Sequence, residues 1–146
     1  MREEGKVHIS FTPITTRIEA NSTIRCVAHF KNIWEPGTIY LQEKVYALFI
    51  NQQYNLICWK CINSGSSNST LIDCKLILTI ALNCAASKIV IAHNHPGGGL
   101  RPSQMDIGIT DKLKEVCDVL DIELLDHIIM TGKDYYSFME NNLIKK

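Results

Sequence analysis

The sequence predicts a single α/β domain, with a mixed β-sheet flanked by helices. A chain of 146 residues has the length of one ordinary domain. Hydrophobic residues make up 46% of it and charged residues 21%, which suits a chain that buries a core. Apolar runs and helically spaced segments follow one another as helix, two strands, helix, strand, helix and two strands. That order is typical of helices packed on a central sheet.

The N-terminal segments predict an extended arm and then a helix. Residues 7–18 alternate loosely and contain Pro13, which fits an arm or an edge strand. Ser22 is expected to cap a helix that runs to about Trp34, because apolar residues recur there at spacings of three and four. Pro36-Gly37 then ends the helix.

The middle of the chain predicts a β-hairpin. The run from Lys44 to Ile50 is continuously apolar after its first residue and rich in strand formers, so we expect a strand buried on both faces. After Asn51–Gln53 the pattern resumes over 54–62, which predicts the partner strand. The polar residues 63–69 predict a loop.

The remaining segments alternate helix and strand and close with a second hairpin. We expect a helix over 74–86 capped by Asp73, a buried strand over 88–92, a loop over 95–99, a helix from Ser103 to about Leu120, and hairpin strands over 124–131 and 135–139.

Charge and hydropathy argue against two classes of partner. Lys plus Arg and Asp plus Glu both number 15, and a formal charge of zero weakens the case for a dedicated nucleic-acid binder without excluding one. The start Met1–Glu4 has mixed charge and no apolar stretch after it, so we expect no secretory signal. The run 76–86 is far shorter than the ~20 residues that span a bilayer. We therefore expect a cytoplasmic protein with no membrane partner and its six cysteines as thiols.

His93 and His95 are the first candidate metal ligands. They stand two residues apart at the end of a predicted buried strand, so both imidazoles point to one side. Imidazole is a favoured zinc ligand, and α/β sheets usually bind ligands at the carboxyl ends of strands. The alternative is a polar strand end whose histidines bond to backbone. The two histidines alone leave both interpretations open.

Asp106 is a candidate third ligand. The loop 96–102 can fold the start of the next helix over the strand end, which brings Asp106 near both histidines. Two histidines and a carboxylate leave a fourth position for water, the pattern of a catalytic zinc site. However, Ser103-x-x-Asp106 also resembles a helix capping box. The two interpretations compete for Asp106, while Ser103 can cap the helix and also face the site.

A hydrolytic zinc site also needs a carboxylate base. Zinc lowers the pKa of a bound water to about 7, and a positioned carboxylate then takes and delivers protons. Glu43, just before the buried strand that starts at Lys44, is the candidate. Spacing alone does not distinguish it from a solvated glutamate such as Glu3 or Glu35.

Together these residues resemble a known motif. Glu43, His93-x-His95 and Ser103-x-x-Asp106 are similar to the JAMM (MPN-plus, JAB) metalloprotease motif. The closer likeness is to the RadC-like branch of bacterial JAB-domain proteins, over roughly residues 41–140. It rests on Gln42-Glu43 and on the segments 92–96, 102–106, 124–129 and 135–138.

The resemblance implies a fold, a cofactor and an activity. The fold is a JAB/MPN-type, cytidine-deaminase-like sheet, expected over 41–146 after an arm and helix over 1–40. The cofactor is Zn²⁺, with His93, His95 and Asp106 as ligands. Glu43 would be the general acid/base, and Ser103 would donate a hydrogen bond to the developing oxyanion. The implied activity is hydrolysis of peptide or isopeptide bonds in a protein or peptide substrate.

Alternative functions follow from the same resemblance. The RadC-like branch carries a DNA-repair label, so one alternative is a protein that acts on or near DNA. Longer members have an N-terminal helix-hairpin-helix segment, for which the residues before Leu41 leave too little room. Another alternative is a non-catalytic JAB interaction module, which we rank lower because all the expected site residues are present. The Pro-containing arm allows packing on a second copy, as a homodimer.

Two further patterns have weaker functional interpretations. Cys58-x-x-Cys61 could form a redox pair or half a zinc site, but it lies in a predicted strand, whereas redox cysteines normally open a helix. His127, next to Asp126, could pair with that carboxylate behind the metal ligands. We favour a structural hairpin histidine with local hydrogen bonds.

Overall fold

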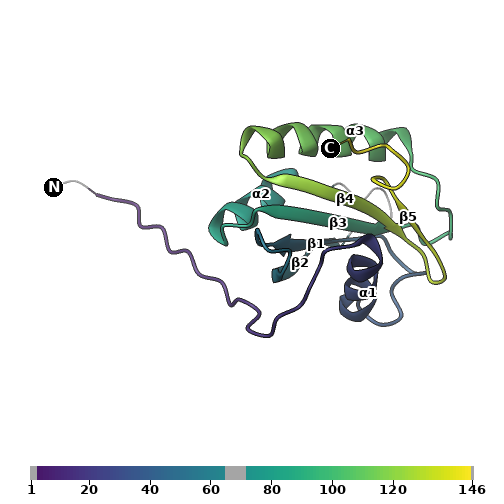
Figure 1. The fold of residues 1–146 in the computed structure, drawn as a ribbon, viewed down its shortest axis with the longest axis horizontal. Coiled ribbons are helices and arrows are strands. Elements are labelled where there is room, and N and C mark those ends of the chain that lie inside the picture. Colours follow the sequence, from purple (N-terminus) through teal and green to yellow (C-terminus); the bar gives the residue numbers. More distant parts are fainter. Residues whose placement is uncertain (1–2, 65–71, 146) are drawn as a thin grey trace.

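The computed structural model describes residues 3–64 and 72–145 and has the predicted order of elements (Figure 1). The elements are α1 (Thr23–Ile33), β1 (Lys44–Ile50), β2 (Leu56–Ser64), α2 (Cys74–Asn83), β3 (Lys88–Asn94), α3 (Gln104–Val119), β4 (Glu123–Met130) and β5 (Tyr135–Ser137). Of the predicted loop 63–69, the first two residues belong to β2 and the rest lies outside the described residues.

The strands form one mixed sheet in the order β2-β1-β3-β4-β5, which confirms the predicted α/β class. Both predicted hairpins are present, because β1 pairs antiparallel with β2 and β4 pairs antiparallel with β5. β1 also pairs antiparallel with β3, whereas β3 and β4 are parallel and connected through α3. This crossover brings the chain from the end of β3 directly into the start of α3.

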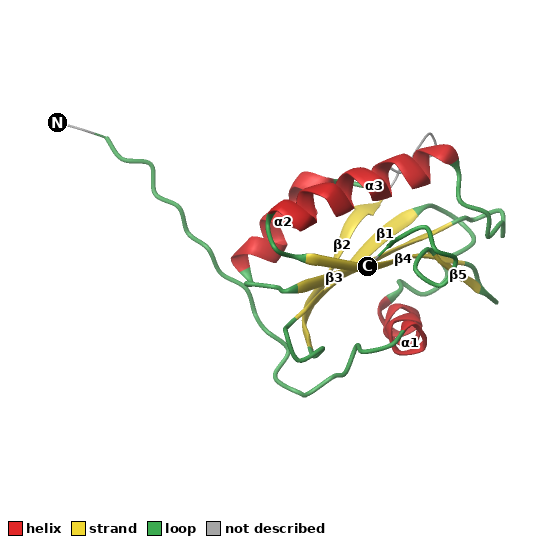
Figure 2. Cartoon of the chain, turned by 45° about the horizontal axis from the view of Figure 1, so that its top comes forward, coloured by secondary structure: helices red, strands yellow, loops and turns green. Residues whose placement is uncertain are grey.

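Helices cover both faces of the sheet, with α2 and α3 on one face and α1 on the other (Figure 2). All seven residues of β1 are buried, as the sequence predicts for a strand covered on both sides. Its side chains alternate between two core clusters. Val45, Ala47 and Phe49 pack with residues of α2 and α3, and Tyr46, Leu48 and Ile50 pack with residues of α1.

The ends of α2 and α3 are set by left-handed residues that are not glycine. Ala85 has φ +53°, and the Ala86 N–H donates to the Ala81 carbonyl over 2.9 Å, as in a Schellman motif. Asp121 takes the same role after α3 with φ +55°. Because no glycine marks this turn, the predicted helix over 74–86 was too long, and α2 ends at Asn83.

The N-terminal arm is extended, as predicted, and projects away from the sheet (Figure 1). Its inner part runs beside the outer edge of β2, where the Leu56 N–H donates to the Ile18 carbonyl and the Ile14 N–H to the Ile57 carbonyl, each over 2.8 Å. Ser22 then caps α1 by accepting from the Arg25 N–H. Within the described residues, no helix has the length and apolar character needed to cross a bilayer.

Candidate metal centre

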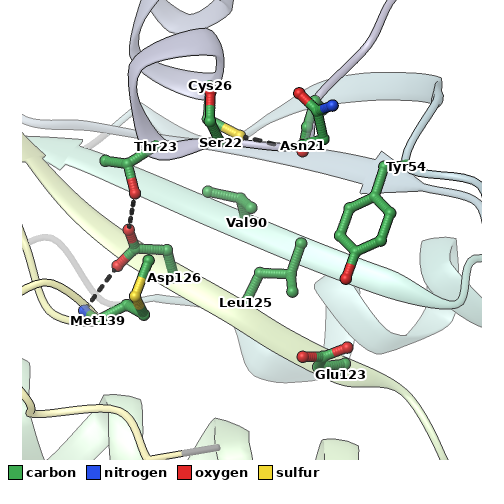
Figure 3. Close-up of a pocket in the computed structure, with 11 residues that line it drawn as sticks. Asn21, Ser22, Thr23, Cys26, Tyr54, Val90, Glu123, Leu125, Asp126 and Met139 are labelled. Atoms are coloured by element: carbon green, nitrogen blue, oxygen red, sulfur yellow. Dashed lines mark hydrogen bonds between the residues drawn. The ribbon is translucent and has the colours of Figure 1, made fainter.

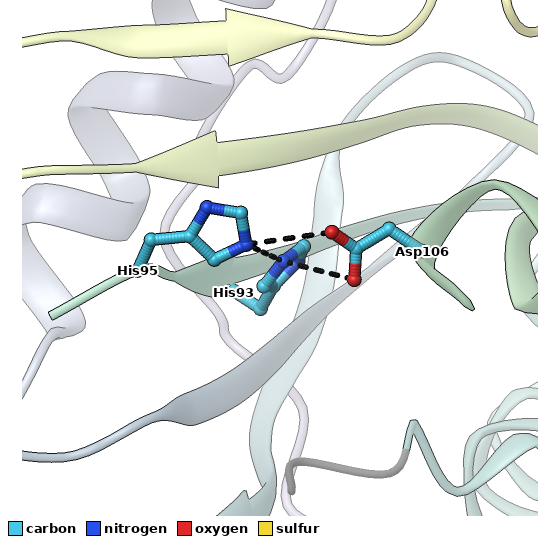
Figure 4. Close-up of side chains that lie close together, drawn as sticks. All are labelled: His93, His95 and Asp106. Carbon is cyan, nitrogen blue, oxygen red and sulfur yellow. Dashed lines mark hydrogen bonds and ion pairs between the residues drawn. The ribbon is translucent and has the colours of Figure 1, made fainter. Parts of the chain in front are cut away.

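The end of β3 and the first turn of α3 bring two histidines and one carboxylate together. His93 is a buried residue of β3, His95 follows just beyond the strand, and Asp106 lies in the first turn of α3. The two Nε2 atoms are 3.0 Å apart. Each lies 3.4 Å from a different oxygen of Asp106, and the three side chains converge on one point (Figure 4). These three residues form a group able to hold a metal ion.

The loop after β3 fixes the orientation of His95. A turn closes where the Gly98 N–H donates to the His95 carbonyl over 2.8 Å, and Gly98 has φ +84°, a conformation that favours glycine. The His95 Nδ1 lies 2.8 Å from the Gly99 carbonyl oxygen. Because a carbonyl only accepts, Nδ1 carries the proton. In the neutral form of the ring, the Nε2 lone pair therefore faces the site.

Asp106 serves the helix cap and the site at the same time. Its Oδ2 accepts the Ser103 N–H over 2.9 Å, and its own N–H donates to the Ser103 Oγ over 3.0 Å, which completes the predicted capping box. The same Oδ2 lies 3.4 Å from the His95 Nε2, while Oδ1 faces His93. The two interpretations of Asp106 therefore coexist, because each carboxylate oxygen has room for more than one partner.

The charge of Asp106 favours a cation at this point. Burial raises the pKa of this carboxyl, but its contacts with His93 and His95 outweigh burial and hold the pKa well below its usual range. In turn, the contact with Asp106 raises the pKa of His95 above its ordinary value. The site therefore stabilises positive charge, whether a proton or a metal ion carries it.

The donor set fits a zinc ion. A tetrahedral zinc with ligands at about 2.0–2.1 Å separates neighbouring ligand atoms by about 3.3 Å. The two Nε2 atoms are 3.0 Å apart, close to that value, and the ligand atoms of all three residues lie within 4.8 Å of one another. Two facing imidazole lone pairs also repel each other unless a proton or a metal ion lies between them. The residues present thus suit the group that the motif implies.

Glu43 lies next to the site, directly before β1. β1 pairs with β3 so that Val45 is opposite His93, which brings the start of β1 beside the end of β3. Glu43 is half-buried, and its charge contributes to the raised pKa of His95. It is therefore close to the candidate ligands, whereas the carboxylate of Glu35 pairs with Lys44.

Asn94 holds the loop that carries Glu43, a role that the sequence did not reveal. Its side chain is fully buried between His93 and His95 in the chain. The Nδ2 group donates to the carbonyls of Ile39 and Gln42 over 2.8 and 2.9 Å. Its Oδ1 accepts the Lys44 N–H over 2.7 Å. These three hydrogen bonds tie both sides of Glu43 to β3.

Ser103 lies exposed at the N-cap of α3. Its Oγ accepts the Asp106 N–H, which leaves the hydroxyl hydrogen available to donate, since no hydrogen bond from it is found in the described part of the chain. Its predicted role at an oxyanion stays a prediction.

His127 contacts the candidate ligand His93 and is not the locally bonded hairpin histidine that the sequence analysis favours. Its Nε2 lies 2.6 Å from the Nδ1 of His93. Complete burial, followed by the charge of His93, lowers its pKa well below the ordinary value, so the ring is neutral. Strand alternation places His127 and Ile129 on the same face of β4. Only the pairing of β3 with β4 shows that this is also the face that carries His93.

The carboxylate of Asp126 turns to the opposite face and does not pair with the imidazole of His127. It accepts hydrogen bonds from the Met139 N–H and the Thr23 hydroxyl (Figure 3), as well as from Ser137. There it lines a cavity of about 350 Å³ between α1 and the sheet. These bonds join α1, β4 and the turn after β5, so Asp126 has a structural role.

Cys58 and Cys61 do not form a pair. They lie three residues apart in β2, and each packs with a different core cluster, Cys58 on the α2/α3 face and Cys61 on the α1 face. No disulfide links the cysteines of the described residues. This placement removes the basis for a redox pair or half of a zinc site.

Comparisons with known proteins found a matching family model and several relatives. A family model described as a RadC-like JAB domain matches residues 20–143. A UPF0758 protein of Streptococcus suis is 45% identical over 101 residues, which is 69% of this chain and 41% of that protein. The UPF0758 protein YfjY of Escherichia coli is 37% identical over 103 residues, 70% of this chain and 64% of that protein. The chain thus matches only part of the length of these relatives, and their name assigns no activity.

Proposed function

The chain belongs to the RadC-like JAB domain family, and on that premise we propose that it is a zinc-dependent hydrolase of peptide or isopeptide bonds. The observation that carries the proposal is the convergence of two Nε2 atoms and the Asp106 carboxylate within 3.0–3.4 Å, beside Glu43. We further propose that the protein works in the cytoplasm on a protein or peptide substrate.

Each site residue has a role in this reaction. His93, His95 and Asp106 would hold the zinc ion. When bound, zinc supplies Lewis acidity that makes a water nucleophilic near neutral pH and polarises a carbonyl. Glu43 takes the proton from the attacking water and delivers it to the leaving amine. The Ser103 hydroxyl donates a hydrogen bond to the carbonyl oxygen as negative charge develops on it.

Zinc content and turnover together test the proposal. We expect one zinc per wild-type chain by elemental analysis, and none in His93→Ala or Asp106→Ala. His8→Ala, in the exposed arm, is the matched control and should keep the metal. The zinc-loaded protein should cleave members of a library of fluorogenic peptides and lysine-linked isopeptides.

A second variant separates metal binding from catalysis. Glu43→Gln should keep zinc and lose turnover by about 10²–10⁴-fold, the usual contribution of general acid–base catalysis. Glu115→Gln, exposed on α3, is the matched control and should behave as wild type. A wild-type chain that takes up no zinc would contradict the proposal. Wild-type rates in Glu43→Gln would remove Glu43 from its role.

A further inference from the structure

A buried relay of hydrogen-bonded side chains, formed by His93, His127 and Thr110, lies on the side of His93 away from Asp106. From the Nδ1 of His93 it passes to the Nε2 of His127 over 2.6 Å, and from the Nδ1 of His127 to the hydroxyl of Thr110 over 2.6 Å. The Thr110 hydroxyl donates in turn to the main-chain carbonyl of Asp106, again over 2.6 Å. All three side chains are at most 3% exposed. The relay thus joins β3, β4 and α3 and ends on the main-chain carbonyl of Asp106, the third candidate ligand.

The donor in each hydrogen bond of this relay follows from the last acceptor, the Asp106 carbonyl. A carbonyl oxygen only accepts, so Thr110 uses its one hydroxyl hydrogen on Asp106. Thr110 must then accept from the Nδ1–H of His127. A neutral imidazole has one N–H, which leaves a lone pair on the Nε2 of His127.

The same logic fixes the tautomer of His93. Because the Nε2 of His127 accepts, the Nδ1 of His93 carries the proton, and the Nε2 of His93 keeps its lone pair. That lone pair faces the Asp106 carboxylate and His95. With the opposite tautomer, an N–H would point into the site and block coordination.

Packing holds the relay in place. The ring of His127 stacks on Phe138 with centroids 4.4 Å apart and planes 17° apart. In the parallel pairing of β3 with β4, His127 is opposite Ile91 and His93 is opposite Ile129, so the two imidazoles are diagonal neighbours on one face. The stacked Phe138 ring therefore restricts the plane of the His127 ring.

We propose that His127 and Thr110 are positioning residues that hold His93 in the tautomer and orientation required of a metal ligand. This inference rests on the proposed metal centre. Partners behind a metal-bound histidine typically contribute about 10–100-fold to metal affinity, because they orient the ring and strengthen its basicity. We expect a loss of that size when the relay is broken.

Zinc affinity of the purified chain, measured by competition with a chromogenic chelator, tests the inference. Thr110→Val replaces the hydroxyl at nearly constant volume, and His127→Phe keeps a ring without the acceptor. Both should weaken zinc binding by about 10–100-fold. Thr110→Ser keeps the hydroxyl and should bind zinc with nearly the wild-type affinity. Leu113→Val, a buried apolar change one turn further along α3, should not alter affinity.

A second measurement needs no zinc. In metal-free protein labelled with ¹⁵N-histidine, two-bond ¹H–¹⁵N correlations report which ring nitrogen is protonated. We expect Nδ1–H for both His93 and His127, and loss of that fixed state for His127 in Thr110→Val. This readout and the conservative Thr110 pair remain informative if His127→Phe does not fold.

Three outcomes would overturn the inference: His93 protonated on Nε2 in the wild type, equal zinc affinity in Thr110→Val and wild type, or equal losses in Thr110→Ser and Thr110→Val. Failure of the proposed function gives a different result, because the wild-type chain then binds no zinc at all. The tautomer of His93, measured in metal-free protein, still decides in that case whether the relay holds this ring.

Discussion

Asn94 illustrates how one side chain can organise a site without facing it. Residues 93, 94 and 95 alternate in direction at the end of β3, so the two histidines face α3 while Asn94 faces the loop before β1. The main-chain groups it binds flank Glu43. Asn94 thus connects the candidate ligands on either side of it to the loop that carries the candidate base, Glu43.

Asn94→Ala should loosen the Glu43 loop. The change leaves two part-buried carbonyls and one N–H without their partner. The Lys44 N–H, whose bond is the buried one of the three, loses a partner that water does not replace, so we expect a loss of about 1–3 kcal/mol by urea denaturation, to which the part-buried carbonyls add less. Hydrogen exchange should accelerate over residues 36–43. Asn83→Ala, exposed at the end of α2, is the control. Unchanged exchange over 36–43 would contradict the assignment.

At the scale of elements, the start of α3 combines helix capping with the site. Ser103 caps the helix, and its partner in the capping box is the candidate ligand Asp106. A helix of 16 residues with its cap formed holds the Asp106 carboxylate at a fixed place over the end of β3. α2 has a simple cap of the same kind, in which Asp73 accepts from the Leu76 N–H over 3.0 Å.

The two caps form a matched pair for mutation. Ser103→Ala and Asp73→Ala should each destabilise the metal-free protein by about 1 kcal/mol, the usual value for a lost N-cap. Only Ser103→Ala should also reduce turnover, because the proposed role at the oxyanion belongs to Ser103 and not to Asp73. Urea denaturation and the cleavage assay, run side by side, check both statements. An equal loss of turnover in both variants would mean that Ser103 acts through stability alone.

At the scale of the whole molecule, the site joins segments far apart in the sequence that the sheet brings side by side. β1, β3 and β4 are adjacent strands, and α3 crosses from β3 to β4 over the face that carries His93. A ligand that binds this arrangement and not the unfolded chain stabilises the whole domain by mass action.

Zinc should therefore raise the melting temperature. At a free zinc concentration of 100 times the dissociation constant, the gain is about 2.7 kcal/mol. For a domain of this size that corresponds to a rise of about 5–10 °C. Calorimetry with zinc, and then with excess chelator, measures the shift and its reversal. His93→Ala should show no shift, and a wild-type melting temperature that does not respond to zinc would count against a folded-state metal site.

Much of the fold and part of the site were predictable from the sequence, because their causes are local. The period of the apolar residues predicted the order of the eight elements. The convergence of His93, His95 and Asp106 followed from strand alternation and a short loop. The end of α2 was misplaced because a left-handed alanine, with no sequence mark, turns the chain at residue 85.

The sequence by itself determined which side chains could meet across one short loop, since strand and helix periods fix directions over a few residues. Tertiary structure alone decided what lies behind them. His127 reaches His93 only through the register of β3 against β4, and Asn94 reaches the Glu43 loop only through the pairing of β3 with β1. Such contacts join residues 34 and more positions apart, and strand register depends on the packing of the whole core.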